Sequence, residues 1–382
     1  MRPRPTLRLA LCWIAALLVA SVLLVRTHFH TRDPDSALYV TVATHLADQP
    51  VRLWIAPQWW GGWNHEGPFR EHPFGVYLLP ALLTRAGVPG EEASFIVGLL
   101  TQVIVLITLV ALARRLLPAP SARMLLWTLQ LLPIAFVFRI RANHEYPLLA
   151  GVVVAVYGIE RARERWPWLL LALSGFLYAL LVKGIFAGLG PALATVWLLV
   201  VPPRDGARNL TGWVGIVLMG VATPVCALLY EHVYMATTGL SFFDYYVGVQ
   251  LRRSRLQGSS LPFPINKVWN ALWYAGRVIW YSAPWSVFLG MTSRMARGTP
   301  ERAWWRFCVG GALLTVGLLA LNDSRADRYM FPAFYLAGAG GTIAALERWP
   351  RFKQLSERLD GFWPWGPAAF WLALFASRLI LG

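Results

Sequence analysis

Long apolar runs, separated by short segments rich in Arg, dominate the pattern of this sequence. Apolar residues within each run are continuous rather than alternating with polar ones, which predicts an all-α protein and argues against a β-barrel. Since a helix needs about 20 largely apolar residues to cross a bilayer, we expect a polytopic bundle of about 11 membrane helices. The predicted spans are residues 8–27, 92–113, 121–139, 147–160, 167–182, 185–201, 211–230, 273–292, 305–321, 331–346 and 364–381.

Arg residues between the runs predict the orientation of the bundle. The first apolar run follows three Arg residues and lacks a small-residue cleavage site, so we expect a retained first helix with a cytoplasmic N-terminus. Alternating from there, every inner turn is rich in Arg, as the positive-inside rule requires. The inner turns are residues 114–123, 160–165, 204–208, 294–306 and 347–358.

The first outer segment, residues 28–90, is long and partly amphipathic. Four of its residues recur at i, i+3, i+4 and i+7, namely Tyr39, Val42, Ala43 and Leu46. This spacing predicts a helix in the interface plane of the membrane. Residues 75–86 contain a proline and are too short to span, so we expect a second surface or re-entrant helix there. We expect one integral membrane unit over residues 1–382, without a separate soluble C-terminal domain.

Composition and charge support a membrane protein. Hydrophobic residues make up 57% of the chain and charged residues only 14%, whereas soluble proteins carry about 25% charged residues. A water-soluble enzyme is therefore excluded. The net charge of +16 is explained by the inner loops, and no nucleic-acid motif accompanies it. The three cysteines, Cys12, Cys226 and Cys308, lie in apolar runs and indicate neither a disulfide framework nor metal-ligand spacing.

The predicted outer face carries arginines against the topological preference, and an anionic ligand on that face explains them. These residues are Arg139, Arg141, Arg252, Arg253, Arg255, Arg325 and Arg328. Lys183 is one of only three lysines and precedes Gly184. It is either a snorkelling side chain or a ligand for a phosphate oxygen. The segment 231–267 is either a solvated charged loop or a phosphate-binding one, and Asp327 and Arg328 could simply pair with each other.

Carboxylates on the same face are candidates for acid–base chemistry. Asp33 and Asp35 follow the first membrane helix, where a carboxylate either caps the next helix or acts as a general base. Glu145 lies at the start of the fourth predicted span, where it either closes an interfacial salt bridge or orients the acceptor or the base. Several His and Glu residues crowd the first outer segment without matching a metal motif. We therefore predict no certain cofactor and a possible divalent metal, with Glu71 and His232 as weak candidate ligands.

Five short motifs, in this order, resemble the GT-C membrane glycosyltransferases, in the branch of protein O-mannosyltransferases and lipid A aminoarabinose transferases. The resemblance covers about residues 8–346. The motifs are Asp35-Ser36-Ala37-Leu38-Tyr39, Glu71-His72-Pro73, Asn143-His144-Glu145-Tyr146-Pro147, Lys183-Gly184 and Arg328-Tyr329-Met330-Phe331-Pro332.

The resemblance implies roles for individual residues. Asp35 takes the place of the proposed base, with Asp33 as its rival, and Glu145 that of a second acidic residue. Lys183 takes a donor-phosphate role, and Glu71 matches an outer-loop Glu before His-Pro. We expect the donor phosphate to be bound by Lys183, Arg328, Arg139, Arg252, Arg253 and Tyr329. The residues expected to line the site or meet the acceptor are His144, Asn143, Glu71, His72 and Tyr39.

The function that follows is transfer of a sugar, hexosyl or pentosyl, on the extracytoplasmic side of the cell membrane. Nucleotide sugars are generally not supplied there, so we expect a polyprenyl-phosphate donor and a lipid, glycan or protein acceptor of the envelope. The phosphate of the polyprenyl donor is a good leaving group, so one carboxylate base and nearby cations suffice for an inverting displacement. The alternatives are a transporter or flippase for an anionic lipid-linked solute and a noncatalytic membrane scaffold.

Overall fold

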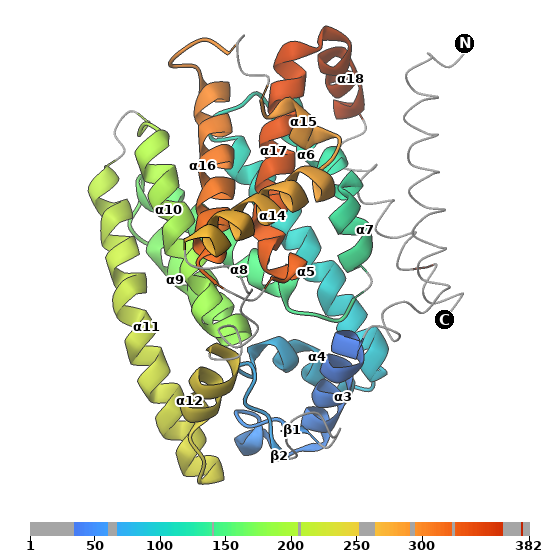
Figure 1. Ribbon diagram of the computed structural model, residues 1–382, viewed down its shortest axis with the longest axis vertical. Coiled ribbons are helices and arrows are strands. Elements are labelled where there is room, and N and C mark those ends of the chain that lie inside the picture. Colours follow the sequence, from blue (N-terminus) through green and yellow to red (C-terminus); the bar gives the residue numbers. More distant parts are fainter. Residues whose placement is uncertain are drawn as a thin grey trace.

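The computed structural model describes residues 34–59, 67–139, 141–204, 208–251, 264–290, 295–322, 325–361 and 376. Its main body is a bundle of long helices packed side by side (Figure 1). The bundle comprises α5 (Gly90–Ala113), α8 (Glu145–Ala162), α9 (Trp168–Lys183), α10 (Leu189–Val200), α11 (Asn209–Thr238), α16 (Pro300–Ala320) and α17 (Phe331–Arg348). The predicted polytopic helical fold is confirmed.

Five helical segments of the described chain are long and apolar enough to cross a membrane. They are Gly90–Ala113, Trp168–Val200, Asn209–Thr238, Pro300–Ala320 and Asp327–Arg348. The number of about 11 membrane helices stays a prediction, and its first and last spans lie largely outside the described residues.

The segment Trp168–Val200 folds back on itself as a hairpin of α9 and α10. Lys183, at the end of α9, contacts Glu145 at the start of α8. Trp197, near the end of α10, donates a hydrogen bond to Glu160 at the other end of α8. The turn is made by Gly184, which has φ +56°, a conformation that favours glycine. The two predicted spans at 167–182 and 185–201 therefore form two antiparallel helices.

Helices α8 and α9 approach closely because glycines face each other. A Cβ built on Gly151 would lie 2.6 Å from the carbonyl oxygen of Gly175, and one on Gly158 would lie 2.5 Å from the nitrogen of Ala172. Small residues of this kind allow helix backbones to pack tightly in a membrane. This contact fixes the start of α8, and with it Glu145, against the end of α9.

Two of the predicted spans are interrupted next to a proline, which lacks the N–H group needed for a helical hydrogen bond. The predicted span 121–139 consists of α6 (Ala119–Thr128), the 3-10 turn η2 (Leu129–Leu131) and α7 (Pro133–Arg139). The predicted span 273–292 consists of the end of α14 (Ile265–Tyr281), a break at Pro284 and α15 (Trp285–Phe288) within its described part.

The first outer segment forms a small layer at one end of the bundle (Figure 1). It contains α3 (Pro34–Asp48), η1 (Val51–Leu53), α4 (Gly75–Arg85) and the antiparallel strands β1 (Gln58–Trp59) and β2 (Gly67–Pro68), in which Gln58 pairs with Pro68. The helix predicted around Tyr39 is confirmed, and its four apolar residues are buried. That face packs against α4 and α5, so it is a protein contact. A position of α3 in the membrane interface stays a prediction.

Two predicted loops contain helices. The prediction that an outer loop begins at residue 231 is wrong, because α11 continues to Thr238 and carries His232 and Tyr234. Glu231 lies on the same helix and accepts hydrogen bonds from the backbone of Phe242 and Phe243, at the start of α12 (Phe242–Tyr245). A π-helical turn, η4 (Tyr246–Leu251), follows α12.

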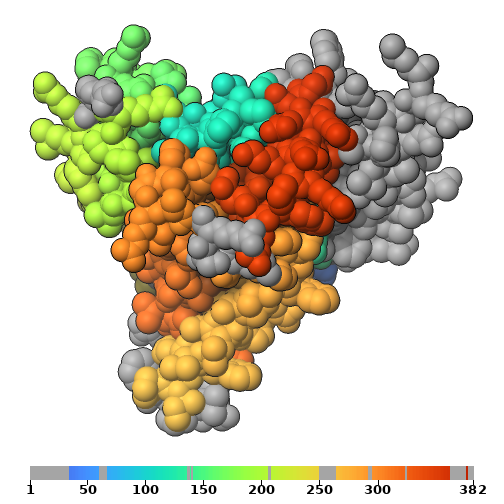
Figure 2. Space-filling model, turned by 90° about the horizontal axis from the view of Figure 1, so that it is seen from above, coloured from blue at the N-terminus to red at the C-terminus, as the bar shows by residue number. Residues whose placement is uncertain are grey.

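At the opposite end of the bundle, the predicted inner loop 347–358 contains α18 (Pro350–Asp360). Figure 2 looks onto this end, with α18 in red. Arg123 of α6 pairs with Asp360, with 2.6 Å between Nε and Oδ1, and so ties α18 to the bundle. A last 3-10 turn, η5 (Asp327–Met330), precedes α17 and leads into the site described next.

Candidate active site

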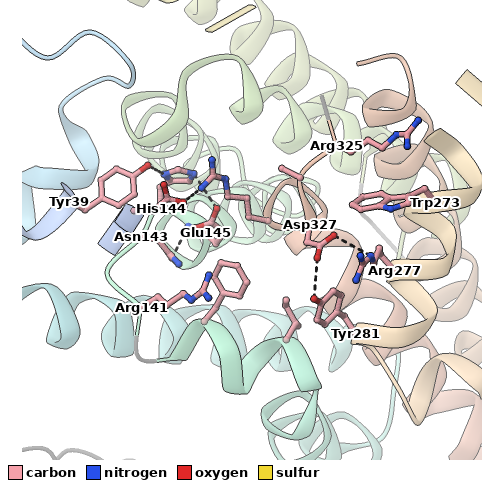
Figure 3. Close-up of a pocket in the computed structure, with 15 residues that line it drawn as sticks. Tyr39, Arg141, Asn143, His144, Glu145, Trp273, Arg277, Tyr281, Arg325 and Asp327 are labelled. Atoms are coloured by element: carbon pink, nitrogen blue, oxygen red, sulfur yellow. Dashed lines mark hydrogen bonds and ion pairs between the residues drawn. The ribbon is translucent and has the colours of Figure 1, made fainter. Parts of the chain in front are cut away.

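A cavity of about 420 Å³ opens between the first outer layer and the bundle (Figure 3). Its walls come from α3, α7, the start of α8, α14 and the segment around η5. The polar and aromatic side chains that line it are Asp35, Tyr39, Phe138, Arg141, Asn143, His144, Glu145, Trp273, Arg277, Tyr281, Arg325, Asp327 and Arg328. Segments nearly 300 residues apart in the sequence therefore meet at one site.

Asp35 and Tyr39 lie one turn apart on α3, so their side chains share one face of the helix. The carboxylate of Asp35 forms an ion pair with the guanidinium of Arg328. Both side chains remain partly exposed, 42% for Asp35 and 36% for Arg328. A carboxylate in this position can therefore meet a substrate and can exchange its proton with water.

Glu145 begins α8, where the side chain of Asn143 accepts a hydrogen bond from its backbone N–H at 3.3 Å. Its Oε1 lies 3.3 Å from Nζ of Lys183, and both side chains are buried. Its Oε2 has no hydrogen-bond partner within the described residues. The buried carboxylate is thus held by one cation and keeps one acceptor oxygen beside the cavity.

His144 lies between α3 and α8. Its Nδ1 is 2.7 Å from the hydroxyl oxygen of Tyr39, and its Nε2 is 3.1 Å from Oε1 of Glu145. Burial lowers the pKa of His144 below its usual value, and Lys183 acts in the same direction while Glu145 opposes it. The ring is therefore neutral near pH 7.

His72 and Glu71 lie between β2 and α4. The ring centroid of His72 is 4.8 Å from that of His144 and 6.3 Å from that of Tyr39. Burial lowers the pKa of His72 well below its usual value, and the charge of Lys183 contributes. His72 thus forms a second layer behind Tyr39 and His144.

Lys183 does not snorkel, because its side chain is buried behind Glu145. Its Nζ also lies 4.9 Å from the ring centroid of Tyr329 and 5.1 Å from that of Phe186. Aromatic faces attract an ammonium group at these distances. Lys183 is therefore enclosed by one carboxylate and two rings.

The opposite wall of the cavity comes from α14 and the residues before α17 (Figure 3). Asp327 accepts a hydrogen bond from the hydroxyl of Tyr281 at 3.1 Å and lies 3.4 Å from Nε of Arg277. Arg325 donates from Nε to the side-chain oxygen of Asn270 at 2.6 Å. Asp327 thus pairs with Arg277, and Arg328 pairs with Asp35. The structure therefore shows two separate ion pairs in place of the possible pair between the neighbours Asp327 and Arg328.

The lining residues that α14 contributes, Trp273, Arg277 and Tyr281, were not among the sequence candidates. All three lie in the span predicted for 273–292. Arg277 is the one charged residue of that span, and an ionisable residue inside a predicted membrane helix is a functional candidate by default. That signal could have identified it.

Other predicted residues are placed as follows. Asp33, Arg252 and Arg253 lie outside the described residues, as does the side chain of Arg139. Within the described chain, no group of three or more His, Cys, Asp and Glu side chains could hold a metal ion. Accordingly, Glu71 and His232 belong to no such group, and His232 is exposed on α11. Metal dependence stays a prediction.

Comparison with known proteins begins with the sequence. Residues 71–230 match the family model described as dolichyl-phosphate-mannose-protein mannosyltransferase. The match includes Glu71, Glu145 and Lys183. No curated protein sequence matches this chain.

Two solved structures share the fold. The crystal structure of ArnT from Cupriavidus metallidurans bound to undecaprenyl phosphate is 14% identical, with a TM-score of 0.61 over 92% of this chain and 62% of that one. The apo structure of ArnT from the same organism is 15% identical, with a TM-score of 0.63 over 92% of this chain and 63% of that one. This chain therefore spans less than two thirds of the length of these structures. The GT-C resemblance is confirmed by the family model and the fold.

Proposed function

We propose that this chain, a multi-pass membrane protein with the GT-C fold, transfers a sugar from a polyprenyl-phosphate donor to an envelope acceptor. The observation that carries the proposal is the cavity itself. It holds a partly exposed carboxylate, Asp35, next to a buried carboxylate, Glu145, and is bordered by Arg141, Arg277 and Arg328. This is the inventory that transfer from a lipid phosphate needs.

The chemistry follows from what each group can do. Asp35 accepts the proton of an acceptor hydroxyl, and the acceptor oxygen bonds to the anomeric carbon of the sugar. The bond between that carbon and the phosphate oxygen breaks, so the polyprenyl phosphate leaves with the bonding electron pair. Attack from the face opposite the phosphate inverts the anomeric carbon. Asp35 then returns its proton to water, because it is partly exposed.

Arginines support departure of the phosphate. A guanidinium carries five N–H donors and can bond a carboxylate and a phosphate together. Arg328 can therefore keep its contact with Asp35 while it meets the donor phosphate. The positive charge of Arg328 and Arg141 beside the cavity stabilises the negative charge that develops on the leaving group.

Lys183 supports the site indirectly in this proposal. Because it is buried against Glu145, it keeps that carboxylate charged, so that Glu145 can orient a hydroxyl of the sugar or of the acceptor through Oε2. The sequence expectation that Lys183 binds the donor phosphate directly requires Lys183 to leave Glu145, so we favour the indirect role.

The relatives support a lipid-linked donor. The matching family model is named for transfer of mannose from dolichyl phosphate, and one ArnT structure holds undecaprenyl phosphate. We place the reaction on the extracytoplasmic side. Asp35, Glu145 and Arg328 gather at the end of the bundle that carries α3 and α4, and the Arg-rich segments predicted to be cytoplasmic lie toward the other end (Figure 1).

The test uses the full chain purified into lipid nanodiscs. Labelled polyprenyl-phosphate hexoses and pentoses are offered with envelope lipid, glycan and peptide acceptors, and transfer is measured. Asp35→Asn should reduce transfer by about 10²-fold or more. Asp48→Asn, an exposed acidic position on the same helix, should leave transfer unchanged. Translocation of a lipid-linked sugar without transfer would instead establish a flippase, and full activity of Asp35→Asn would remove Asp35 as the base.

A further inference from the structure

Four buried side chains form a continuous polar connection behind the cavity. Tyr39 contacts His144 at 2.7 Å, His144 contacts Glu145 at 3.1 Å, and Glu145 contacts Lys183 at 3.3 Å. The chain of contacts links α3 to α8 and α8 to α9. It joins the helix that carries Asp35 to the carboxylate on the other side of the site.

The contacts of His144 determine its tautomer. A neutral imidazole has one N–H and one acceptor nitrogen. If Nδ1 carried the hydrogen, the lone pair of Nε2 would face the Glu145 carboxylate, which is repulsive. The negative charge of the Glu145 carboxylate therefore favours the hydrogen on Nε2, which lies 3.1 Å from Oε1 without hydrogen-bond geometry, and Nδ1 then accepts the hydroxyl hydrogen of Tyr39.

This tautomer determines what Tyr39 offers to the cavity. Because its hydrogen is donated to His144, the Tyr39 oxygen can only accept a hydrogen bond from a substrate. Tyr39 lines the cavity one helical turn after Asp35. The oxygen is thus set to receive a hydroxyl group of the sugar or the acceptor beside the proposed base.

We infer that His144 is a positioning residue of the transfer reaction: in its neutral, Nε2-protonated form it makes Tyr39 a hydrogen-bond acceptor for a substrate hydroxyl and holds α3 in register with Glu145. This inference rests on the proposed function. The reaction as proposed above needs only Asp35 and cations, so His144 adds a residue that acts through Tyr39 and Glu145 rather than on the reacting atoms.

Groups on every neighbouring element act on the charge state of His144. Tyr39 faces it from α3, His72 from the segment before α4, and Lys183 from α9. Glu145, on its own helix, is the nearest carboxylate and favours the charged ring. Burial and the charge of Lys183 act against it. Protonation of His144 would convert Nδ1 into a donor and turn the Tyr39 hydrogen toward the cavity.

Variants separate the two nitrogens of His144. His144→Asn keeps an oxygen close to the place of Nδ1, whereas His144→Leu removes both polar contacts. Tyr39→Phe should lower kcat/KM by about tenfold, the effect of about one neutral hydrogen bond. His144→Asn should stay within about fivefold of wild type, and His144→Leu should lose about 10²-fold. Adding Tyr39→Phe to His144→Leu should cost less than twofold more, because the two residues act together.

Two further measurements report on the positioning role of His144 and do not respond to a general loss of folding. The acid limb of the kcat/KM profile should move to lower pH in His144→Asn, because the titrating imidazole is gone. In the full chain labelled with ¹⁵N-histidine, the NMR shifts of His144 should show the Nε2-protonated neutral ring at pH 7. The NMR readout does not depend on transfer, so it tests the contact even if the wild type proves to have no transferase activity.

Two results would overturn the inference. One is a wild-type kcat/KM and pH profile in His144→Leu. The other is an Nδ1-protonated or charged His144 at pH 7. If His144→Leu fails to fold, the other two variants still decide the matter: a wild-type kcat/KM in Tyr39→Phe, or a loss in His144→Asn well beyond fivefold, contradicts the inference.

Discussion

Lys183 and Glu145 form an ion pair inside the bundle, with 3.3 Å between Nζ and Oε1 and 1% of each side chain exposed. The pair joins the turn between α9 and α10 to the start of α8. Two charges taken out of water in this way are tolerated because each neutralises the other. The relationship ties the fold to the site, because the same contact holds the end of α9 against the start of α8 and sets the charge of a carboxylate beside the cavity.

Removing the cation of this pair should destabilise the protein. Lys183→Met leaves a buried carboxylate without its partner, which costs about 3–5 kcal/mol in comparable cases. We expect a clearly lower Tm in detergent micelles, measured by differential scanning fluorimetry.

The double variant Lys183→Met, Glu145→Gln is the control. It removes both charges and should recover much of the lost Tm, because the penalty arises from the uncompensated charge. Equal Tm values for the single and the double variant would show that the pair does not hold this part of the bundle.

The ion pair between Arg328 and Asp35 should behave in the opposite way. Both side chains are partly exposed, and pairs of this kind contribute about 0–1 kcal/mol to stability. Arg328→Gln should therefore leave Tm nearly unchanged. It should lower kcat/KM by about 10²-fold, because a cation near the leaving phosphate is lost.

Arg351→Gln is the matched control for this variant, since Arg351 is exposed on α18 at the other end of the bundle. Its kcat/KM should equal that of the wild type. A similar loss in both variants would show that net charge, rather than the position of Arg328, limits transfer.

Two histidines near the cavity, the buried His144 and the half-buried His72, predict how stability depends on pH. The pKa of His72 and that of His144 both lie below the usual value, mainly because burial disfavours the charged ring. An unfolded histidine takes up its proton near pH 6.5, while the folded ones resist it. Acidification below about pH 6.5 therefore favours the unfolded chain, and the loss ends once the pH falls below the folded pKa values.

We expect Tm to fall between pH 7 and pH 5 in wild type. His144→Asn should flatten this dependence, and His72→Asn should do the same. His232→Asn should keep the wild-type slope, because His232 is exposed on α11. A slope that is unchanged by His144→Asn and by His72→Asn would assign the acid effect to carboxylates instead.

The sequence predicted one wall of the cavity better than the other. Asp35, His144 and Glu145 were identifiable because they lie at helix ends on one predicted side of the membrane, where costly ionisable residues indicate a functional site. The structure brings them to a single cavity. The roles that we assign to these residues remain predictions until the variants are measured.

The wall formed by α14 could not be predicted in the same way. Arg277 signals a functional position by its charge, but its partner Asp327 lies 50 residues further along the chain. A pattern of apolar runs contains no information about which side chains pair across helices. It left the local pairing of Asp327 with Arg328 open as an alternative, and the structure shows two separate ion pairs with residues of other helices.

The positions of helix ends could not be predicted accurately from the sequence for the same reason. The charged residues Glu231 and His232 marked a plausible end for α11, yet the helix continues to Thr238. Glu231 is satisfied by the backbone N–H groups of Phe242 and Phe243, so its charge does not end the helix. A cap formed by a residue eleven positions earlier is visible only when the chain is folded.

Glu160, at the end of α8 away from the site, allows stability to be separated from catalysis. Its Oε2 accepts hydrogen bonds from Arg163 at 2.7 Å and from Trp197 at 2.8 Å, and its Oε1 lies 3.3 Å from Nε of Arg115. The carboxylate is buried and holds α8, α10 and the end of α5 together. Glu160→Gln leaves the buried guanidinium of Arg163 without its counter-charge, so we expect a loss of about 3–5 kcal/mol.

The same variant should not change transfer by the protein that remains folded. Fifteen residues of helix separate Glu160 from Glu145, which at 1.5 Å per residue is about 22 Å. Chemical denaturation should therefore show a lower midpoint in Glu160→Gln, with kcat/KM equal to wild type at low denaturant. Glu164→Gln serves as the control, because Glu164 is more exposed, at 31%, and its ion pairs should contribute about 0–1 kcal/mol. If Glu164→Gln shifts the midpoint as much as Glu160→Gln does, burial is not what makes the Glu160 contacts stabilising.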